Sequence, residues 1–534
     1  MQPLLQVENL QLSFAKQEII KGINFTINKG ETFALVGESG SGKSLAALSV
    51  LRLHPAQANL KADSVQLSEI DILRTPERDL CKVRGRRIAM IFQDPMSSLN
   101  PVMTIAQQIS ETLEIHFALN KRQCQLRVVE LLQQVGIPEP SRRLNDYPHQ
   151  LSGGQRQRVM IAIALAAEPD LLIADEPTTA LDVTIQAQIL ELLKKIQQEN
   201  GMALWLISHD LALVSNMADR VAVMQAGEIV ETANNTQLFN QPQHEYTKKL
   251  LAALPDINAV LAQKNAQESP LLQVQSFKVH YPIKKGLFKR TVGQVKAVDG
   301  VDFQLATGKT LALVGESGCG KTTLGKALLN LIPKTSGLVI FDGLDLAKIS
   351  YTQLREQRSA MQIIFQDPIA AMNPRMLIID IISEGIHALN KAITVEQKVQ
   401  LVSELLEQVG LDKNALYRYP HEFSGGQRQR ICIARALAVK PKLIICDEPT
   451  SALDVSVQKT IIELLKQLQK TQGISYLFIT HDLAVVAEIA DEVAVMYAGK
   501  IIEQGATQQI LKQPQQAYTK KLLSAVPVLI SAES

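Results

Sequence analysis

The sequence has few of the features that mark secreted, membrane-spanning or metal-rich proteins. Its five cysteines are scattered and form no C-x-x-C pair, so neither a disulfide framework nor a zinc or iron–sulfur site is indicated. No apolar run approaches the ~18 residues of a membrane-spanning helix. The N-terminus lacks the basic and apolar regions of a signal peptide. We therefore expect a protein of a reducing cytosol without a membrane span of its own.

An excess of charge of one sign is also missing. The 55 Lys and Arg residues against 53 Asp and Glu residues give a formal net charge of +2, so no strong field indicates a nucleic-acid or lipid partner. Hydrophobic residues make up 46% of the sequence, which is enough to form buried cores. The length of 534 residues predicts several domains.

A phosphate-binding loop is the strongest local signal. Residues 37–44 fit G-x-x-x-x-G-K-[ST] and lie between an expected strand, 32–36, and an expected helix, 44–53. Glycines let successive N–H groups point at a phosphate, and the helix N-terminus adds positive potential. The alternative is a glycine-rich turn with an incidental lysine. Lys43 would reach the β- and γ-phosphates, and Ser44 would ligate Mg²⁺. The predicted ATP-binding residues of this loop are Gly37, Ser39, Gly40, Gly42, Lys43 and Ser44.

This loop has a second copy, which makes an incidental match untenable. Residues 315–322 repeat it between another expected strand, 310–314, and a helix. Three later motifs also recur at one shared spacing: 151–158 as 423–430, Asp175-Glu176 as Asp447-Glu448, and His209 as His481. The second loop supplies Gly315, Ser317, Gly318, Gly320, Lys321 and Thr322.

The chain is therefore a tandem duplication of two domain-sized units. We expect domain one at 1–255, a polar linker at 256–270 and domain two at 271–534. Strands alternate with helices in each unit, which predicts an α/β fold with a mainly parallel sheet. Opening strands at 5–12 and 23–27 alternate as in an antiparallel β subdomain, and the pattern between 93 and 151 is that of a helical subdomain.

Domain two carries an insertion with a basic segment, 284–290. Such charge runs are usually solvated loops, and we expect a loop here.

Acidic pairs follow an apolar strand in both units. Asp175 and Glu176 end the strand 171–174, at the sheet edge where open α/β sheets bind ligands. We predict that Asp175 and Asp447 hold Mg²⁺ through water, and that Glu176 and Glu448 orient or deprotonate the attacking water. The alternative, an acidic pair that caps a turn, fails because a phosphate loop accompanies it twice.

Three further motifs are weaker when taken alone. Ser152-Gly153-Gly154 opens a helix and predicts an anion site, although Ser152 could be a helix cap only. His209 and His481 lie beyond the sheet edge, which favours contact with a terminal phosphate over a structural role. Gln93 and Gln366, each in Phe-Gln-Asp-Pro, could touch Mg²⁺ or the water, or be turn residues. The second copy of the glycine motif is Ser424, Gly425 and Gly426.

Taken together and repeated, these motifs resemble the ATP-binding subunits of ABC transporters over nearly the whole chain. Within that family the sequence is similar to peptide importers, through 92–101 and 365–374 and through the tails 241–251 and 513–523. It is most similar to the fused two-ATPase type of oligopeptide and microcin C importers. A glutathione or nickel importer is the nearer alternative. Less fitting are ribosome-associated twin ATPases, which join their units by a long charged helix, and DNA-repair ATPases, which carry zinc cysteines or a coiled coil.

The resemblance implies a mechanism that spacing cannot show. The units would pair head to tail around two ATP molecules and Mg²⁺, with Ser424 completing the first site and Ser152 the second. Phe14 and Tyr281 would stack on the adenines or else belong to the sheet core. The helical segments near Gln93 and Gln366 would push on the membrane partners.

The implied partners are two membrane-spanning permease subunits and a substrate-binding protein, with no nucleic acid. The implied location is the cytoplasmic face of the inner membrane. No key residue is missing from either unit, so we predict two competent sites. Cys319 lies inside the second loop beside Lys321 and a helix N-terminus, a setting that can lower a thiol pKa. We therefore hypothesise that alkylation there blocks the second site and that ATP protects it; the alternative is a small residue that only fits the loop.

Overall fold

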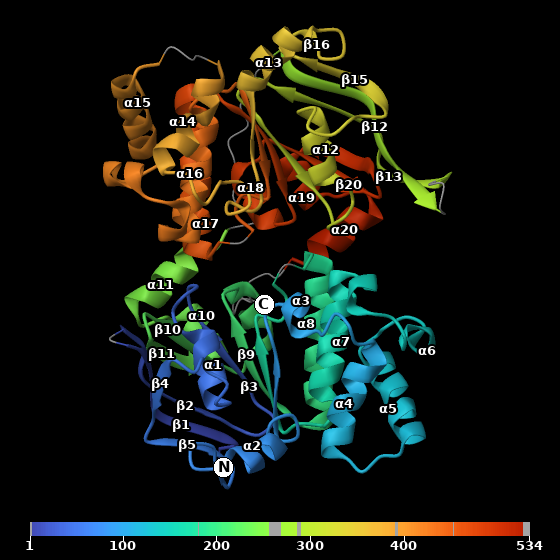
Figure 1. The fold of residues 1–534 in the computed structure, drawn as a ribbon, viewed down its shortest axis with the longest axis vertical. Helices are drawn as coiled ribbons and strands as arrows, with labels where there is room; N and C mark the ends of the chain where they lie inside the picture. Colours follow the sequence, from blue (N-terminus) through green and yellow to red (C-terminus); the bar gives the residue numbers. More distant parts are fainter. Residues whose placement is uncertain are drawn as a thin grey trace. The chain divides into compact units, whose positions relative to one another are not determined.

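The computed structural model describes residues 3–15, 17–179, 181–255, 269–285, 290–389, 393–451 and 453–526. The described residues form two compact units (Figure 1), one within 3–181 and 185–254 and the other within 182–184 and 255–526.

The main sheet of the first unit is mostly parallel, as the alternation of strands and helices predicts. Its central strands are completely buried, because α7 and α8 pack on one face and α1 with the small sheet on the other, which explains their mainly apolar sequences. Only the edge pair at one side is antiparallel. The strand order is β11 (Glu228–Asn234), β10 (Arg220–Gln225), β3 (Thr32–Val36), β9 (Ala203–Ser208), β8 (Leu171–Asp175), β7 (Ile88–Ile91).

A smaller antiparallel sheet lies beside it. Its first strand alternates buried and more exposed positions, as expected of a sheet with one face on the core. The strand order is β2 (Gln17–Ile27), β1 (Leu5–Phe14), β5 (Ser64–Leu67), β6 (Ile70–Asp71), and β4 (Ala58–Lys61) also pairs with β1.

The helices complete this unit, and several of them form the helical subdomain expected between residues 93 and 151. α4 and α5 each start with a reciprocal capping box, at Thr104 and Asn120, which satisfies the free N–H groups of a helix start. The helices are α1 (Lys43–Val50), α2 (Glu77–Val83), α3 (Pro95–Ser98), α4 (Ile105–His116), α5 (Lys121–Gln134), α6 (Pro140–Arg143), the 3₁₀ turn η1 (Pro148–Gln150), α7 (Gly153–Leu165), α8 (Val183–Asn200), α9 (Leu211–Met217), α10 (Asn235–Asn240) and α11 (Glu245–Ala252).

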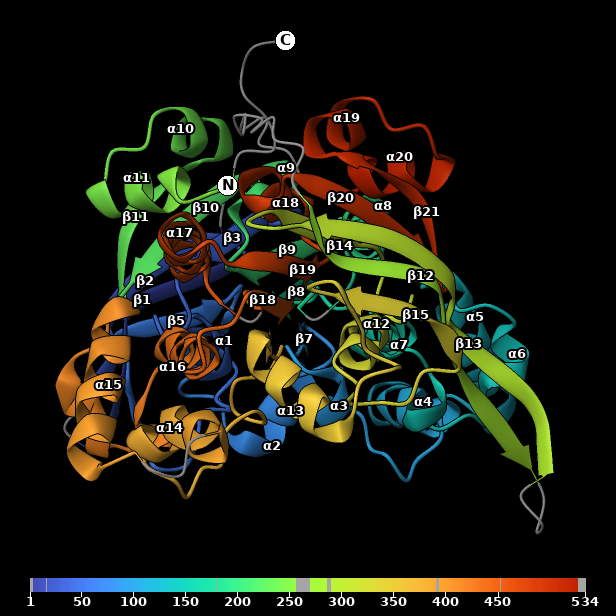
Figure 2. The same ribbon diagram turned by 90° about the horizontal axis from the view of Figure 1, so that it is seen from above.

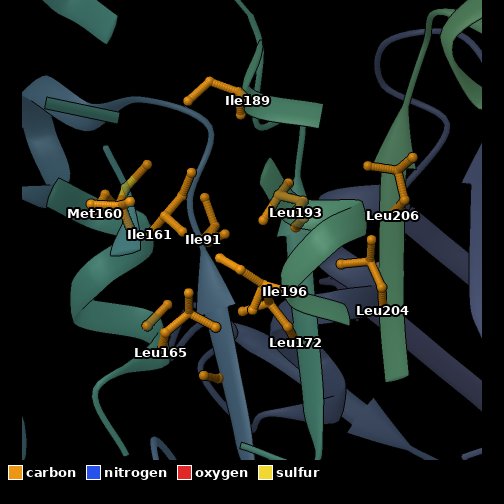
Figure 3. Packing of buried hydrophobic residues seen from close by; sticks show 14 of the residues in the cluster. Ile91, Met160, Ile161, Leu165, Leu172, Ile189, Leu193, Ile196, Leu204 and Leu206 are labelled. Carbon is orange, nitrogen blue, oxygen red and sulfur yellow. The ribbon is translucent and has the colours of Figure 1, made fainter. Parts of the chain in front are cut away.

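The core between sheet and helices fixes the strand ends that carry the candidate site. Figure 3 shows side chains of α7 and α8 packed on those of the parallel strands, in one cluster of fully buried residues. Burying an aliphatic side chain of this size stabilises the fold by about 1.5–3 kcal/mol. The labelled members are Ile91, Met160, Ile161, Leu165, Leu172, Ile189, Leu193, Ile196, Leu204 and Leu206.

The second unit repeats this architecture. Its main sheet has the order β17 (Met361–Ile364), β18 (Leu443–Asp447), β19 (Ser475–Thr480), β14 (Thr310–Val314), β20 (Glu492–Tyr497), β21 (Lys500–Ala506), and its small sheet has the order β13 (Arg290–Ala306), β12 (Pro270–Lys285), β15 (Ser336–Phe341), β16 (Leu344–Asp345). Its helices are α12 (Lys321–Leu328), α13 (Tyr351–Ala360), α14 (Ile378–Leu389), α15 (Val395–Gln408), η2 (Lys413–Tyr417), η3 (Pro420–Glu422), α16 (Gly425–Leu437), α17 (Val455–Gln472), α18 (Leu483–Ile489), α19 (Thr507–Lys512) and α20 (Ala517–Ser524).

The two ends of the basic insertion are strand rather than loop. β12 continues to Lys285 and β13 begins at Arg290, with Lys284 paired to Thr291. The result is a long two-stranded ribbon (Figure 2). Backbone pairing across the ribbon overrides the local signal of the charge run, and residues 286–289 lie outside the described part.

Element boundaries follow the prediction closely for the two mainly apolar strands before the phosphate loops and less closely elsewhere. β3 and β14 have the predicted limits. Helix α1 ends at Val50 rather than Leu53. The expected linker falls on 256–268, outside the described residues, and Pro270 already begins β12. Among the helices of the described residues, none combines the length and apolar character needed to cross a membrane.

Candidate active site

The loop after β3 is a preformed concave turn. Gly37 has a φ of 154°, and a Cβ there would lie 2.2 Å from the carbonyl oxygen of Met224, so no other residue fits. Lys43 is only 4% exposed, and its Nζ donates to the carbonyl oxygens of Gly37 at 2.7 Å and Glu38 at 2.8 Å. The ammonium therefore lies over the loop, where a phosphate would be bound.

The second unit has the same loop geometry. Gly315 has a φ of 151°, and its Cβ would lie 2.2 Å from the carbonyl oxygen of Met496. Lys321 Nζ donates to the carbonyl oxygens of Gly315 at 2.6 Å and Glu316 at 3.0 Å. Ser39, Gly40 and Gly42, like Ser317, Gly318 and Gly320, lie in the turns between these strands and α1 or α12.

A hydroxyl and a carboxylate meet beside each loop. Ser44 Oγ donates to Asp175 Oδ1 at 2.9 Å, and Thr322 Oγ1 donates to Asp447 Oδ1 at 2.8 Å. Each pair joins the first turn of a helix to the end of a distant strand. Hydroxyl and carboxylate oxygens are the hard ligands that Mg²⁺ prefers, so this donor set fits the predicted metal.

The electrostatics of the strand-end aspartates differ from those of the neighbouring glutamates. Burial raises the pKa of the Asp175 carboxyl to about 6, although the hydrogen bond from Ser44 opposes the shift. Burial likewise raises the pKa of Asp447, against the hydrogen bond from Thr322. A cation bound beside either aspartate would offset the cost of burying the ionised carboxylate, so this environment favours cation binding.

Glu176 follows immediately and is held by three side chains. Its φ is 46°, in the left-handed region that costs a residue with a Cβ about 1 kcal/mol or more. Gln93 Nε2 donates to its Oε2 at 2.6 Å and Thr179 Oγ1 to the same oxygen at 2.9 Å. His209 Nδ1 lies 3.1 Å from its Oε1. The three predicted residues Gln93, Glu176 and His209 thus form one cluster.

These partners keep the Glu176 carboxyl ionised. Burial would raise its pKa, but the hydrogen bond and charge of His209, the Thr179 hydroxyl and the charge of Lys43 lower the pKa to about 2. A carboxylate that is ionised over the whole physiological range can orient water and accept a proton from it.

The second unit has the matching cluster with looser contacts. Gln366 Nε2 donates to Glu448 Oε2 at 3.0 Å, and His481 Nδ1 lies 3.4 Å from Glu448 Oε1. The φ of Glu448 is 48°. Burial would raise the pKa of Glu448, but the hydrogen bond and charge of His481 lower it. Burial would lower the pKa of His481, but Glu448 raises it.

The Ser-Gly-Gly segments begin α7 and α16 as N-caps. The hydroxyl of Ser152 accepts from the Gln155 N–H at 3.3 Å, and the Gln155 side chain accepts from the Ser152 N–H at 3.1 Å. Ser424 and Gln427 repeat this box. None of these bonds reaches the phosphate loop of its own unit. Gly154 allows close packing on α8, since a Cβ would lie 2.8 Å from Ile185 Cγ2. The remaining members are Gly153, Gly425 and Gly426.

The two candidate adenine contacts have different surroundings. Phe14 ends β1 and packs, half-buried, against the core cluster under the small sheet. Tyr281 lies on β12 and is 43% exposed. Thr179 is a site residue to which the sequence reasoning gave no role of its own, although its motif, Asp-Glu-Pro-Thr-Thr, stood next to the predicted glutamate.

The lowered thiol pKa expected for Cys319 is contradicted, whereas the effect of alkylation stays a prediction. Its side chain is 9% exposed, and burial raises the pKa of the thiol against the charge of Lys321. Because the thiol belongs to a buried hydrophobic cluster, desolvation outweighs the nearby ammonium.

Family comparisons agree with this geometry. A family model described as "ABC transporter" matches residues 20–179 and 298–451. A second, "Oligopeptide/dipeptide transporter, C-terminal region", matches 230–276 and 502–534.

Similar curated proteins share the full length of the chain. The Agrobacterium fabrum peptidoglycan transport ATP-binding protein YejF is 49% identical over 98% of this chain and 96% of its own length. The glutathione import ATP-binding protein GsiA of Escherichia coli O157:H7 is 46% identical over 98% of this chain and 90% of its own length. Among solved structures, the dimeric bacterial ABC transporter cassette MJ0796 aligns with 44% of this chain and 98% of its own, at 25% identity and a TM-score of 0.40.

Both the matched ranges and the duplicated site therefore lead to one assignment. The chain belongs to the ABC transporter family, as a tandem-fused ATP-binding protein, an ATPase subunit, that carries the C-terminal region of the oligopeptide/dipeptide transporters.

Proposed function

We propose that this chain hydrolyses ATP to energise the import of peptides through a transporter of the bacterial inner membrane. One observation carries the proposal: both units hold the same lysine, hydroxyl–aspartate pair and glutamate cluster, and both end in a peptide-transporter tail. Neither unit lacks a group that phosphoryl transfer needs.

The proposed roles follow from the geometry of each group. Lys43 and Lys321 bind the β- and γ-phosphates. Ser44 with Asp175, and Thr322 with Asp447, hold Mg²⁺, which when bound offsets the charge of the phosphate oxygens. Glu176 and Glu448 orient and deprotonate the attacking water. The adjacent glutamines and histidines hold these carboxylates in place and contact the terminal phosphate; they are Gln93, His209, Gln366 and His481.

The remaining predicted contacts are also part of the proposal. The exposed helix starts at Ser152 and Ser424 are anion sites that bind the terminal phosphate of ATP. Phe14 and Tyr281 contact the adenines. The partners are two membrane-spanning permeases and a substrate-binding protein, which place the chain at the cytoplasmic face of the membrane.

For the substrate we propose short peptides. The tails match the oligopeptide/dipeptide transporter region, and the two relatives are named for peptidoglycan transport and for glutathione import. A peptide importer for oligopeptides, including microcin C-like antibiotics, is the first candidate. Glutathione import is the second, because GsiA is 46% identical to this chain.

The test is transport in a strain that lacks this gene. Uptake of labelled di- to oligopeptides, peptidoglycan-derived peptides and glutathione is measured, with sensitivity to a peptide antibiotic. The intact gene should restore uptake of peptides, and a gene carrying both E176Q and E448Q should not. Restoration of glutathione uptake alone would select the second candidate, and no restoration of any of these would contradict both.

A further inference from the structure

We propose that Tyr246 and Tyr518, which belong to the C-terminal tails of the two units, are positioning residues of the phosphate loops. In the first unit the backbone N–H of Glu38 donates to the hydroxyl of Tyr246 at 3.3 Å. In the second unit the N–H of Glu316 donates to the hydroxyl of Tyr518 at 3.0 Å. Each tyrosine is more than 200 residues from its loop in sequence, so only the fold brings them together.

The bond acts on the peptide unit that also holds the loop lysine. The N–H of Glu38 and the carbonyl of Gly37 belong to one planar peptide, whose N–H and C=O point in opposite directions. That carbonyl accepts from Lys43 Nζ at 2.7 Å. The tyrosine and the lysine therefore hold the two ends of the same peptide. Gly315, Glu316, Lys321 and Tyr518 repeat the arrangement.

A third contact limits how this peptide can move. Gly37 packs so closely on the end of β10 that a Cβ would meet the Met224 carbonyl oxygen at 2.2 Å. If the peptide rotated, it would lose the tyrosine bond and move the carbonyl that fixes the lysine. The tyrosine hydroxyl thus helps to hold the ammonium over the loop before a phosphate arrives, and preorganisation of this kind improves binding by reducing its ordering cost.

The tail itself is anchored to the sheet. Glu231, on β11, accepts the backbone N–H groups of Gln243 at 2.8 Å and His244 at 3.0 Å, directly before α11. Glu503, on β21, accepts those of Gln515 at 2.7 Å and Gln516 at 3.2 Å, before α20. Figures 1 and 2 both show α10 and α11 beside β10 and β11, and Figure 2 shows α19 and α20 beside β20 and β21.

Packing makes the tail a rigid support. Tyr246 is 9% exposed and belongs to the same buried cluster as Leu238 and Leu250 of the tail. In the second unit the ring of Tyr518 lies 4.5 Å from that of Tyr497. The peptide-transporter tail of each unit is therefore a built part of that unit's nucleotide site, and this inference rests on the proposed role of the loops in binding phosphate.

The test measures MgADP binding by titration calorimetry to the full chain with one site silenced. On a K321A background, Y246F removes only the hydroxyl; on a K43A background, Y518F does the same for the second unit. Y497F, on the K43A background, removes a hydroxyl from the neighbouring ring and is the matched control. The Tm of each protein without nucleotide is measured in parallel.

We expect Y246F and Y518F to weaken MgADP binding by about 2- to 10-fold, the effect of one lost hydrogen bond, with the nucleotide-free Tm and the Y497F control unchanged. A lower Tm without a change in Kd would assign the tyrosines to packing alone and overturn the inference. Unchanged Kd and Tm would also overturn it. If the double variant K43A/K321A bound MgADP as tightly as either single variant, the proposed phosphate-binding role of the loops would fail as well. This measurement therefore distinguishes a failure of the loop proposal from a failure of the tyrosine inference alone.

Discussion

The hydroxyl of Ser44 donates to Asp175 across 2.9 Å, and Thr322 makes the same bond to Asp447 at 2.8 Å. In each unit this bond joins the loop that would hold the phosphates to the strand end that carries the acidic pair. Serine in one unit and threonine in the other make the same hydrogen bond, which indicates that the hydroxyl oxygen is the atom that the site requires.

Ser44→Thr should retain ATP hydrolysis within about twofold, whereas Ser44→Ala should reduce it by about tenfold, or 1.4 kcal/mol in the barrier. The threonine supplies the same oxygen, as Thr322 does in the second unit, whereas alanine removes a predicted Mg²⁺ ligand. The measurement is steady-state hydrolysis against Mg²⁺ concentration on a K321A background. An alanine variant with the Mg²⁺ dependence of the background protein would contradict this role.

Asp175→Asn should stabilise the nucleotide-free protein at about pH 7.5 and abolish hydrolysis at the first site. Because burial raises the folded-state pKa of Asp175 to about 6 from its ordinary value of 3.8, the protonated carboxyl favours the fold at low pH. That contribution is lost as the pH rises through about 6. The ionised side chain then costs about 2–3 kcal/mol.

The gain from the asparagine should therefore grow between about pH 4 and pH 6 and level off above. Chemical denaturation at several pH values in this range, without nucleotide or divalent ion, measures it. A gain that does not depend on pH would show that the desolvated charge is not its source.

Glu176→Gln and Glu448→Gln should each retain ATP binding, and the double variant should hydrolyse ATP at least about 10²-fold more slowly than the parent. The amide keeps the size of the side chain but cannot accept a proton from water. Binding by titration and phosphate release by a coupled assay separate the two effects. Full hydrolysis in the double variant would remove the glutamates from the reaction.

Alkylation should modify Cys81 first and Cys319 slowly. Cys81 is exposed, whereas Cys124, Cys319, Cys432 and Cys446 are buried, and burial raises the thiol pKa of Cys319. Peptide mass spectrometry after a timed reaction with N-ethylmaleimide gives the order. Rapid labelling of Cys319 that ATP prevents would restore the original expectation of a reactive thiol in the loop.

Some features of the fold could be predicted from sequence because their cause is local. Phe33–Val36 is an apolar run between Thr32 and Gly37, and the strand has the predicted limits Thr32–Val36. Helix α1 ends at Val50 rather than at the predicted Leu53. The apolar residues Leu51 and Leu53 continue the hydrophobic pattern beyond the end of the helix. The pairing of Lys284 with Thr291 was not predicted, because it joins β12 to β13 and the local charge pattern does not show it.

The sequence by itself determined the duplication, the phosphate loops and the residue types of the site, since glycine spacing, the lysine and the acidic pair are constraints of local backbone and chemistry. Only the tertiary structure decided which groups surround each carboxylate and how its pKa shifts. It buries Asp175 and surrounds Glu176 with Gln93, Thr179 and His209, and so moves their pKa values in opposite directions. It also brings Tyr246 to Glu38, because burial and long-range hydrogen bonds depend on packing that no local pattern encodes.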